Sequence, residues 1–207
     1  SYSLIPNDPY FSSEWGLNNT GQTIGGQVGI VDADVDAPEA WDSSTGSSSV
    51  IVAVVDSGVK WDHPDLAANI FVNTADPIDG VDNDGNGFVD DYRGWDFVGS
   101  NINAPVPDNN PMDEYGHGTH VAGTIGAVGN NGLGVTGVAQ HVKLLPLKIG
   151  GSSNSVSVAA ATSALNYIAM MRDRGFNIRV SNHSWGGSGF NQALSDAITQ
   201  QQNRGIL

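Results

Sequence analysis

The feature that most constrains the fold of this 207-residue chain is an uninterrupted apolar run from Val50 to Val55. The run is mostly β-branched, which favours a strand, and its lack of polar alternation indicates burial on both faces, as in a parallel sheet covered by helices. It ends at Asp56-Ser57-Gly58. Because ligands collect at the carboxyl ends of strands in open α/β sheets, Asp56 is a candidate functional residue. The alternative is an aspartate that only forms a turn before glycine.

A second candidate is His117, which stands between two glycines. Apolar residues recur after it with helical spacing, at Val121, Ile125 and Val128. This spacing predicts a buried helix that ends in the Gly- and Asn-rich segment 129–132. A histidine at the start of such a helix, flanked by glycines, is open to a substrate. The alternative is a histidine whose ring is satisfied by local hydrogen bonds.

Elsewhere strands alternate with helices, which predicts an α/β fold: a doubly wound, mostly parallel sheet with helices on both faces. Residues 1–49 are polar and rich in turn signals and are expected to form an arm of the domain whose body is 50–207. Pro146 argues against a strand around it, because proline cannot donate to a ladder. The further predicted strands are 94–98, 142–149, 178–184 and a start at 206–207. The further predicted helices are 36–41, 158–171 and 194–201.

The charge balance limits the classes of partner. The sequence holds 22 acidic and 8 basic residues, for a net charge of −14. This charge argues against nucleic acid and anionic membrane as partners, and it is compatible with cation binding. There is no cysteine, so disulfides and thiolate sites are excluded. The best candidate for a membrane span, 156–171, is too short, and no signal peptide is visible.

The segment 79–91 is similar to the start of an EF-hand-type calcium loop. Oxygen-bearing side chains occupy alternate positions from Asp82 to Asn86, and Gly87 permits a sharp turn. Arg93 stands at the twelfth position, where an EF-hand has a bidentate glutamate, so the site must close differently. The candidate ligands are Asp82, Asp84, Asn86, Phe88, Asp90 and Asp91, with Asp79 as another residue able to close the site. The alternative is a solvated acidic turn, although clustered carboxylates repel one another without a cation.

Three segments together resemble signatures of the subtilisin-like serine peptidases, the subtilases. They are Asp56-Ser57-Gly58 at a strand end, the stretch from His117 to Thr124 at a helix start, and Asn182-His183-Ser184-Trp185-Gly186-Gly187. The resemblance extends over nearly the whole chain. It implies the subtilisin-like fold and a serine endopeptidase whose Asp, His and Ser follow one another in that order.

The resemblance implies a role for each matching residue. Asp56 would orient His117, and His117 would act as general base and then as general acid. The residues that would bind extended polypeptide substrate are Ser184, Trp185 and Gly186, with Gly150 and Gly151 on the opposite side. His120 would be structural, and its spacing from His117 is a weak metal signal.

The resemblance also implies a calcium ion (Ca²⁺) near the N-terminus and a secreted or extracellular protein. The matching ligand positions are Asp8, Asp65, Val128, Asn131, Leu133 and Val135, of which the apolar ones could offer only backbone carbonyls. Besides the polypeptide substrate, the expected partners are the protein's own C-terminal part or a propeptide.

One departure from the family pattern concerns the nucleophile. The sequence holds no Gly-Thr-Ser-Met-Ala type segment and no Ala-Gly-Asn segment for the oxyanion asparagine. We therefore expect a truncated domain, the N-terminal part of a catalytic domain, that is inactive as it stands. One alternative is a calcium-stabilised binding or scaffold relative without chemistry. Another is a hydrolase that uses Asp56 as nucleophile or metal ligand, which would leave the His117 segment unexplained.

Overall fold

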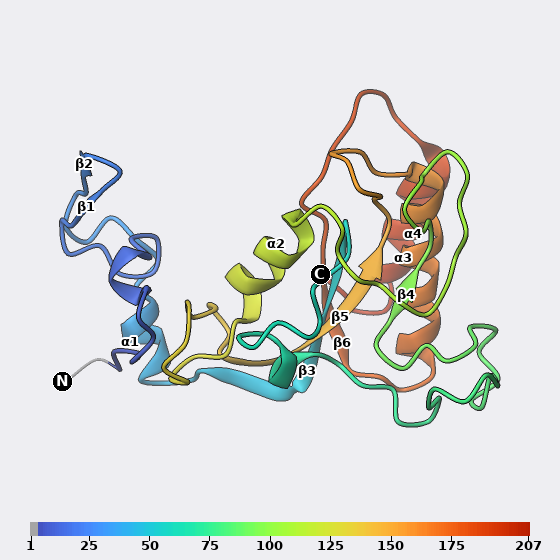
Figure 1. The fold of residues 1–207 in the computed structure, drawn as a ribbon, viewed down its shortest axis with the longest axis horizontal. Coiled ribbons are helices and arrows are strands. Elements are labelled where there is room, and N and C mark those ends of the chain that lie inside the picture. The colour runs from blue at the N-terminus through green and yellow to red at the C-terminus, as the bar shows by residue number, and fades with distance from the viewer. Residues whose placement is uncertain (1–3) are drawn as a thin grey trace.

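The computed structural model of the chain describes residues 4–207 and contains a sheet of four parallel strands in the order β4-β5-β3-β6 (Figure 1). The strands are β3 (Gly46–Asp56), β4 (Trp95–Asp96), β5 (His141–Lys148) and β6 (Ile178–Asn182). The helices that cover the sheet are α2 (His117–Gly126), α3 (Val158–Asp173) and α4 (Gln192–Gln202). The predicted α/β architecture with a parallel sheet is confirmed.

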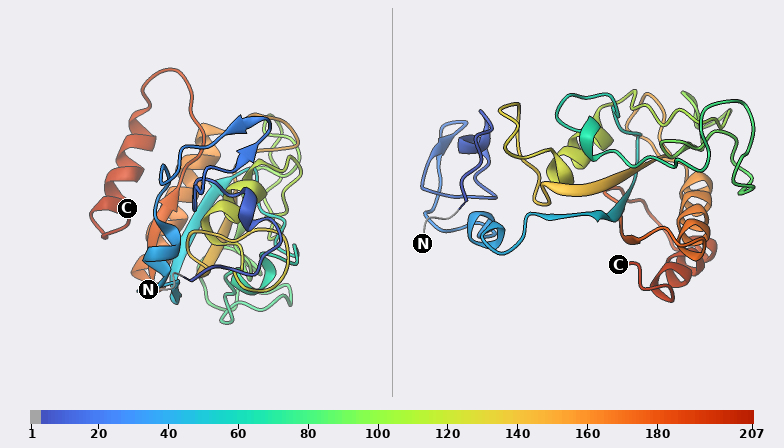
Figure 2. Two further views of the ribbon diagram at one scale, coloured as in Figure 1. Left: turned by 90° about the vertical axis from the view of Figure 1, so that its left-hand side faces the viewer. Right: turned by 90° about the horizontal axis from the view of Figure 1, so that it is seen from below.

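Strand β3 is buried on both faces, as its unbroken apolar sequence predicts. Ile51, Ala53 and Val55 pack in the core on the side of α3 and α4, whereas Val52 and Val54 pack on the side of α2. Successive side chains of a strand point to opposite faces, so one apolar run fills both cores. Figure 2 shows the result: α2 lies on one side of the sheet, and α3 and α4 lie on the other.

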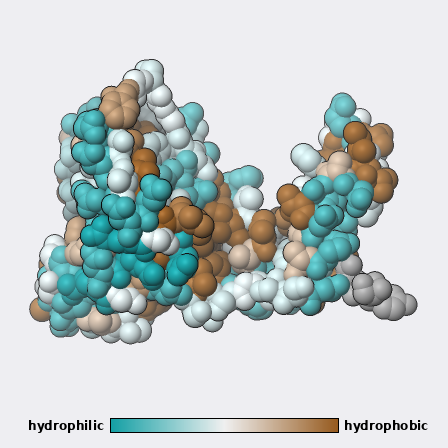
Figure 3. All heavy atoms as spheres, turned by 180° about the vertical axis from the view of Figure 1, so that it is seen from behind, coloured by the Kyte–Doolittle hydropathy of each residue, from teal (hydrophilic) through white to brown (hydrophobic). Residues whose placement is uncertain are grey.

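The N-terminal segment projects from the sheet and has a small core of its own (Figure 1). Its elements are the 3-10 helix η1 (Phe11–Ser13), the antiparallel pair β1 (Thr23–Ile24) and β2 (Gln27–Val28), and helix α1 (Ala37–Trp41). Several hydrogen bonds tie the segment to the loop after α2; among them, Trp41 Nε1 donates to the Val138 carbonyl at 2.9 Å, and the Tyr10 amide donates to the Gly134 carbonyl at 3.0 Å. Figure 3 shows apolar side chains gathered on this segment, where Val28 and Ile30 are exposed.

Helix α2 ends at Gly126, earlier than the predicted end in 129–132. Ala127 already has an extended backbone, with ψ at 144°, and its carbonyl accepts the Gly137 amide at 3.0 Å. The Val128 amide donates to the Asp65 carbonyl at 2.9 Å and so leaves the helical pattern. Val128 therefore fits the helical spacing of apolar residues without being part of the helix. The helix ends because the chain after Gly126 folds back against it.

Pro146 lies inside β5, opposite Val54 of β3, although its ring removes a ladder donor. The Leu144 and Lys148 carbonyls accept amides of Phe71 and Phe97, so even-numbered residues of β5 face the β4 edge of the strand. Strand β4 begins only beside Leu147. The backbone of Pro146, which lacks an N–H donor, thus faces a part of the sheet edge where no neighbouring strand pairs with β5. The prediction that Pro146 argues against a strand is therefore wrong.

The residues after α4 return to the sheet. The Leu207 amide donates to the Arg179 carbonyl at 3.0 Å, and the Ser181 amide donates to the Leu207 carbonyl at 2.8 Å. This pattern joins the end of the chain to β6, in keeping with the predicted start of a strand. None of the helices within residues 4–207 is both long and apolar enough to span a bilayer.

Candidate active site

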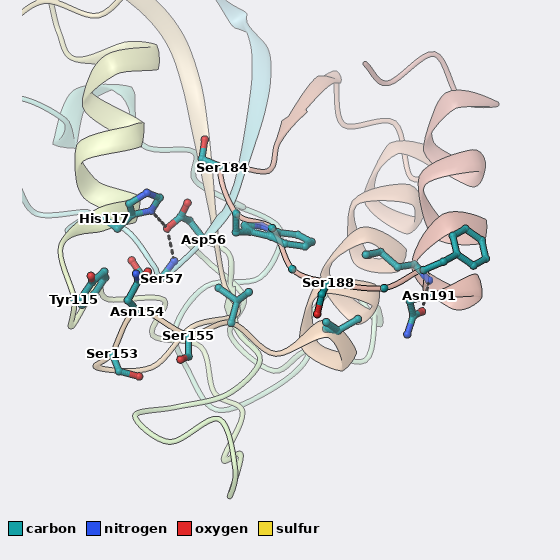
Figure 4. A pocket seen from close by; sticks show the side chains of 18 residues that line it. Asp56, Ser57, Tyr115, His117, Ser153, Asn154, Ser155, Ser184, Ser188 and Asn191 are labelled. Carbon is teal, nitrogen blue, oxygen red and sulfur yellow. Dashed lines mark hydrogen bonds and ion pairs between the residues drawn. The ribbon is translucent and has the colours of Figure 1, made fainter.

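The carboxyl end of β3 and the first turn of α2 place two sequence-predicted residues side by side. Asp56 Oδ1 lies 2.7 Å from His117 Nδ1, so the predicted contact between them is present (Figure 4). The Asp56 side chain is 3% exposed and the His117 side chain is 45% exposed. An ionised carboxylate can only accept, so Nδ1 carries the proton and Nε2 is left free to act as a base. This arrangement can hold a histidine in one tautomer and move a proton at its open side.

The close approach of helix and strand depends on Gly118, the residue after the histidine. A Cβ atom built there would collide with the Gly58 carbonyl oxygen and lie 3.0 Å from the Asp56 Cβ. Gly118 is fully enclosed, and its amide donates to Ser57 Oγ at 2.9 Å. Any larger residue would push α2 away from the end of β3 and lengthen the Asp56–His117 distance.

The Asp56 carboxylate is held unevenly. Oδ1 accepts the Ser57 amide at 2.7 Å as well as His117 Nδ1. Oδ2 is buried and has no hydrogen-bond partner among residues 4–207. The oxygen that faces the histidine is therefore the one whose position the backbone fixes.

An open groove of about 880 Å³ leads away from the Asp56–His117 pair. One wall comes from the loop after β5, at Ser153 to Val156, and the other from the segment that follows β6. Ser184, Trp185 and Gly186 all line this second wall. Trp185 Nε1 donates to the Val55 carbonyl at 2.8 Å, which ties the wall to the end of β3. Figure 4 shows the labelled side chains of both walls around the pair.

Gly150 and Gly151 lie behind the first wall. Both are buried, and Gly150 forms an antiparallel bridge with Val156. A Cβ on Gly151 would lie 2.6 Å from the Ser100 carbonyl oxygen. The loop residues beyond them, and not the glycines, border the groove. Their part in substrate binding stays a prediction.

Asp113, a hydrogen-bond acceptor in the loop before α2, was not predicted from the sequence. Burial alone would raise the pKa of this carboxyl, but hydrogen bonds from Thr119 and from the Gly116 and Tyr115 amides outweigh it and hold the pKa below its ordinary value. The only sequence signal is its place shortly before a glycine that begins a helix.

The first group of predicted calcium ligands surrounds a single loop. Asp8 and Asp65 are buried, at 4% and 3% exposure. Asp65 Oδ1 accepts Asn131 Nδ2 at 2.8 Å, and Asp8 Oδ2 accepts the Asn130 amide at 2.8 Å. The other predicted positions lie on the same loop, since Val128, Leu133 and Val135 each donate an amide to Asp65 or Asn131. The structure thus gathers all six positions.

Glu14 joins this group and was not predicted. Its carboxylate accepts the Thr136 amide at 3.1 Å. Burial, together with the negative charges of Asp8 and Asp65, raises the pKa of Glu14 to about 7 against the opposing Thr136 hydrogen bond. None of the ion pairs within residues 4–207 includes these three carboxylates. The group therefore concentrates negative charge and oxygen donors without a balancing side chain.

The loop 79–91 divides its predicted ligands into two sets. Asp82 accepts the amides of residues 85–87, and Asp90 accepts those of residues 79 and 80, so both cap turns. The other set converges on Asp91, whose carboxylate accepts Asn86 Nδ2 at 2.7 Å. Phe88 turns its ring into the core, 4.9 Å from the ring of Tyr167, so only its backbone could reach a cation.

Side chains outside the EF-hand spacing complete the second set. Asn73 Nδ2 donates to Asp91 Oδ1 at 2.7 Å and to Asp84 Oδ2 at 3.0 Å, and Tyr167 donates to Asp91 Oδ2 at 2.6 Å. Asp76 Oδ2 accepts the Asp91 amide at 2.9 Å. Burial raises the pKa of the Asp91 carboxyl despite these donors.

Arg93, at the twelfth position of the EF-hand spacing, does not face the acidic cluster. Its guanidinium stacks over the rings of Trp61 and Tyr92, at 4.4 and 4.9 Å. Within residues 4–207, no three His, Asp or Glu side chains form a ready-made metal site, His120 included. A cation in either loop would need amide and carbonyl oxygens beside the carboxylates.

Comparison with known proteins places this geometry in a family context. The sequence profile of the subtilase family matches residues 47–207. Thermitase of Thermoactinomyces vulgaris is 33% identical over 202 residues, which are 98% of this chain and 55% of thermitase. Subtilisin-like protease 1 of Plasmodium vivax is 39% identical over 144 residues, which are 69% of this chain and 20% of that protein.

Solved structures give the same fold. A protease from Pseudoalteromonas arctica PAMC 21717 superimposes with a TM-score of 0.71 at 26% identity, over 99% of this chain and 57% of the protease. Sphericase superimposes with a TM-score of 0.61 at 29% identity, over 78% of this chain and 45% of sphericase. The chain thus spans about half the length of thermitase and of these solved structures.

Proposed function

Because the chain belongs to the subtilase family, we propose that it forms part of a serine endopeptidase that hydrolyses peptide bonds in extended polypeptides. The observation that carries the proposal is the hydrogen bond between buried Asp56 and half-exposed His117 at the end of an open groove. A buried carboxylate that fixes the tautomer of a solvent-accessible histidine is the arrangement that activates a serine hydroxyl.

In this proposal the two residues divide the proton chemistry. His117 Nε2 takes the proton of a serine hydroxyl as that oxygen attacks the peptide carbonyl, and then gives the proton to the leaving amine. Asp56 holds the ring in place and stabilises the positive charge that the ring carries between these steps. The serine belongs to a segment that these 207 residues do not contain.

The substrate would lie in the groove as an extended strand. Ser184, Trp185 and Gly186 lie just after β6 and border the groove, which supports the proposal that they bind an extended chain. The described groove-lining residues include no lysine or arginine, and their one carboxylate, Asp56, is occupied by His117.

The test is a peptidase assay with a casein-type substrate. We expect no turnover above background from the 207-residue chain, and turnover once the chain is joined to its natural continuation. Loss of an oxyanion donor alone typically lowers turnover about a hundred- to a thousandfold, and the nucleophile is missing as well. The His117→Ala variant of the joined protein should be inactive. The matched control is His120→Ala, one turn along the same helix.

Each outcome separates the competing functions. Turnover by the joined protein that survives His117→Ala would refute the assigned role of the histidine. A joined protein that binds polypeptide and calcium but never cleaves would favour the non-catalytic relative.

We further propose that calcium binds at two acidic sites, one where Asp8, Glu14 and Asp65 surround the loop after α2 and the other in the loop 79–91. The predicted ligands at both sites are oxygen atoms, which calcium prefers, and none of the predicted ligand residues carries sulfur or imidazole. At the N-terminal site, the gathering of Asp8, Asp65 and Glu14, none of which forms an ion pair within residues 4–207, supports the proposal. In the loop 79–91, the buried carboxylate of Asp91 supports it. Calcium would supply the charge that offsets these carboxylates and would join segments far apart in the sequence.

The remaining partners are proposed on the same basis. A net charge of −14 disfavours nucleic acid and anionic membrane surfaces, so polypeptide is the expected partner. Beyond substrate, that class includes the protein's own C-terminal part or a propeptide. Secretion is proposed from the family alone.

A further inference from the structure

Asp113 lies in the loop before α2, and its carboxylate accepts five hydrogen bonds. Oδ1 accepts Ser57 Oγ at 2.9 Å and the amides of Tyr115 and Gly116 at 3.0 and 2.8 Å. Oδ2 accepts the amide and the hydroxyl of Thr119 at 2.9 and 2.6 Å. Every one of these donors is neutral, so the carboxylate is held by directed hydrogen bonds and not by an ion pair.

These bonds satisfy the start of the helix that carries His117. The first amides of a helix have no partner within it and need acceptors from elsewhere. Gly116, at the N-cap, has no side chain to provide one. Asp113 accepts the Gly116 and Thr119 amides, and Ser57 Oγ accepts the Gly118 amide at 2.9 Å.

The same bonds join the helix to the end of β3. Ser57 Oγ donates to Asp113 and accepts from Gly118, so one hydroxyl connects the strand, the loop and the helix. A second connection runs through Thr119 Oγ1, which donates to Asp113 and accepts the Lys60 amide at 2.9 Å. Both connections lie next to the Asp56–His117 pair in the chain.

We propose that Asp113 is a positioning residue that holds Asp56 and His117 at hydrogen-bonding distance. Ser57 is bonded covalently to Asp56, and Gly118 is bonded covalently to His117. The hydrogen-bonded bridge through Asp113 and Ser57 therefore fixes the distance between Asp56 and His117. A hydrogen bond between a ring N–H and a carboxylate oxygen forms at about 2.7–3.2 Å, so a small shift of α2 weakens the contact between His117 and Asp56. The inference rests on the proposed function in that the Asp56–His117 pair is taken to be catalytic.

The test uses the 207-residue chain and the low-field proton resonance of His117 Nδ1–H, which reports its hydrogen bond to Asp56 directly. Three variants weaken the bridge to different degrees: Asp113→Ala, Asp113→Asn and Ser57→Ala. The matched control is Asp108→Asn, an exposed aspartate of the same loop whose carboxylate, within residues 4–207, accepts only the Asn110 amide. Amide hydrogen exchange at Gly118 and Thr119 is measured in parallel.

We expect the bridge variants to lose or broaden the Nδ1–H resonance and to accelerate exchange at Gly118 and Thr119 about ten- to a hundredfold, since the bridge includes hydrogen bonds to the charged Asp113 carboxylate. Asp108→Asn should change neither. A merely structural cap would accelerate exchange and leave the resonance unchanged, and this result would overturn the proposal. If Asp113→Ala does not fold, Ser57→Ala and Asp113→Asn decide the matter by the same two readouts.

The wild-type spectrum separates the two levels of the argument. If the wild-type chain shows no Nδ1–H resonance, the Asp56–His117 hydrogen bond is refuted, and the proposed function and the role of Asp113 fail together. If the wild type shows the resonance and all bridge variants retain it, only the role of Asp113 is refuted.

Discussion

Replacing Gly118 by alanine adds one methyl group at the closest contact between α2 and β3. That methyl would collide with the Gly58 carbonyl oxygen and press on Asp56. The Gly58 carbonyl is part of the backbone and the Asp56 side chain is buried, so neither group can rotate away from the added methyl. Overpacking of this kind costs about 1–3 kcal/mol of unfolding free energy. For a chain of this length the loss lowers the Tm by roughly 2–4 °C per kcal/mol.

The matched substitution is Gly123→Ala, five residues along the same helix. A Cβ at Gly123 meets nothing within 4 Å, so the change only removes a flexible residue from the helix interior. We expect it to stabilise the chain by up to about 0.5–1 kcal/mol. Urea unfolding of both variants should therefore show midpoints displaced to opposite sides of the wild-type midpoint. The Nδ1–H resonance of His117 should disappear in Gly118→Ala and persist in Gly123→Ala. Equal midpoints, or an unchanged resonance in Gly118→Ala, would refute the argument that Gly118 sets the Asp56–His117 distance.

Two further predictions concern the two proposed calcium sites. Each bound calcium ion, at a hundred times its dissociation constant, should raise the unfolding free energy by about 2.7 kcal/mol relative to chelator, and superimposable thermal melts would contradict calcium binding. The folded pKa of Glu14, about 7, exceeds its ordinary value of 4.5. In chelator, Glu14 should therefore stabilise the fold fully below pH 4.5 and lose that contribution as the pH rises through 7, since the folded state binds the extra proton. Glu14→Gln should flatten the stability profile over this range in urea titrations, and an unchanged slope would show that Glu14 is not the group responsible.

Several features of the fold follow from local sequence patterns. The run from Val50 to Val55 has no polar residue, and it forms the strand that both cores share. The histidine between glycines begins a helix, and the apolar face of that helix points to the sheet through Ala122. Gly118 is needed because the helix approaches Asp56 so closely, whereas Gly116 is needed because its φ is 100°. In these cases the residue types of a short segment are enough to predict its local structure.

Other features depend on segments that meet only in the folded chain. Pro146 is tolerated because its missing donor faces a stretch of the sheet where β4 has not yet begun. Asn73 and Asp76 reach Asp91 from outside the calcium-loop spacing, and Glu14 reaches Asp8 and Asp65 through the folding of the N-terminal segment. No periodicity marks these residues, since their partners are set by the path of the chain.

The Asp56–His117 pair shows what the sequence predicts and what depends on the tertiary structure. The sequence alone identified Asp56 and His117 as the candidate residues, because a carboxylate at a strand end and a histidine at a helix start have recognisable local surroundings. Only the tertiary structure decided how they are held at 2.7 Å, because that distance depends on Asp113 and Ser57, which are 56 residues apart and meet through a single hydroxyl. Hydrogen bonds between distant segments are specified by three-dimensional position, and no local pattern of residue types encodes them.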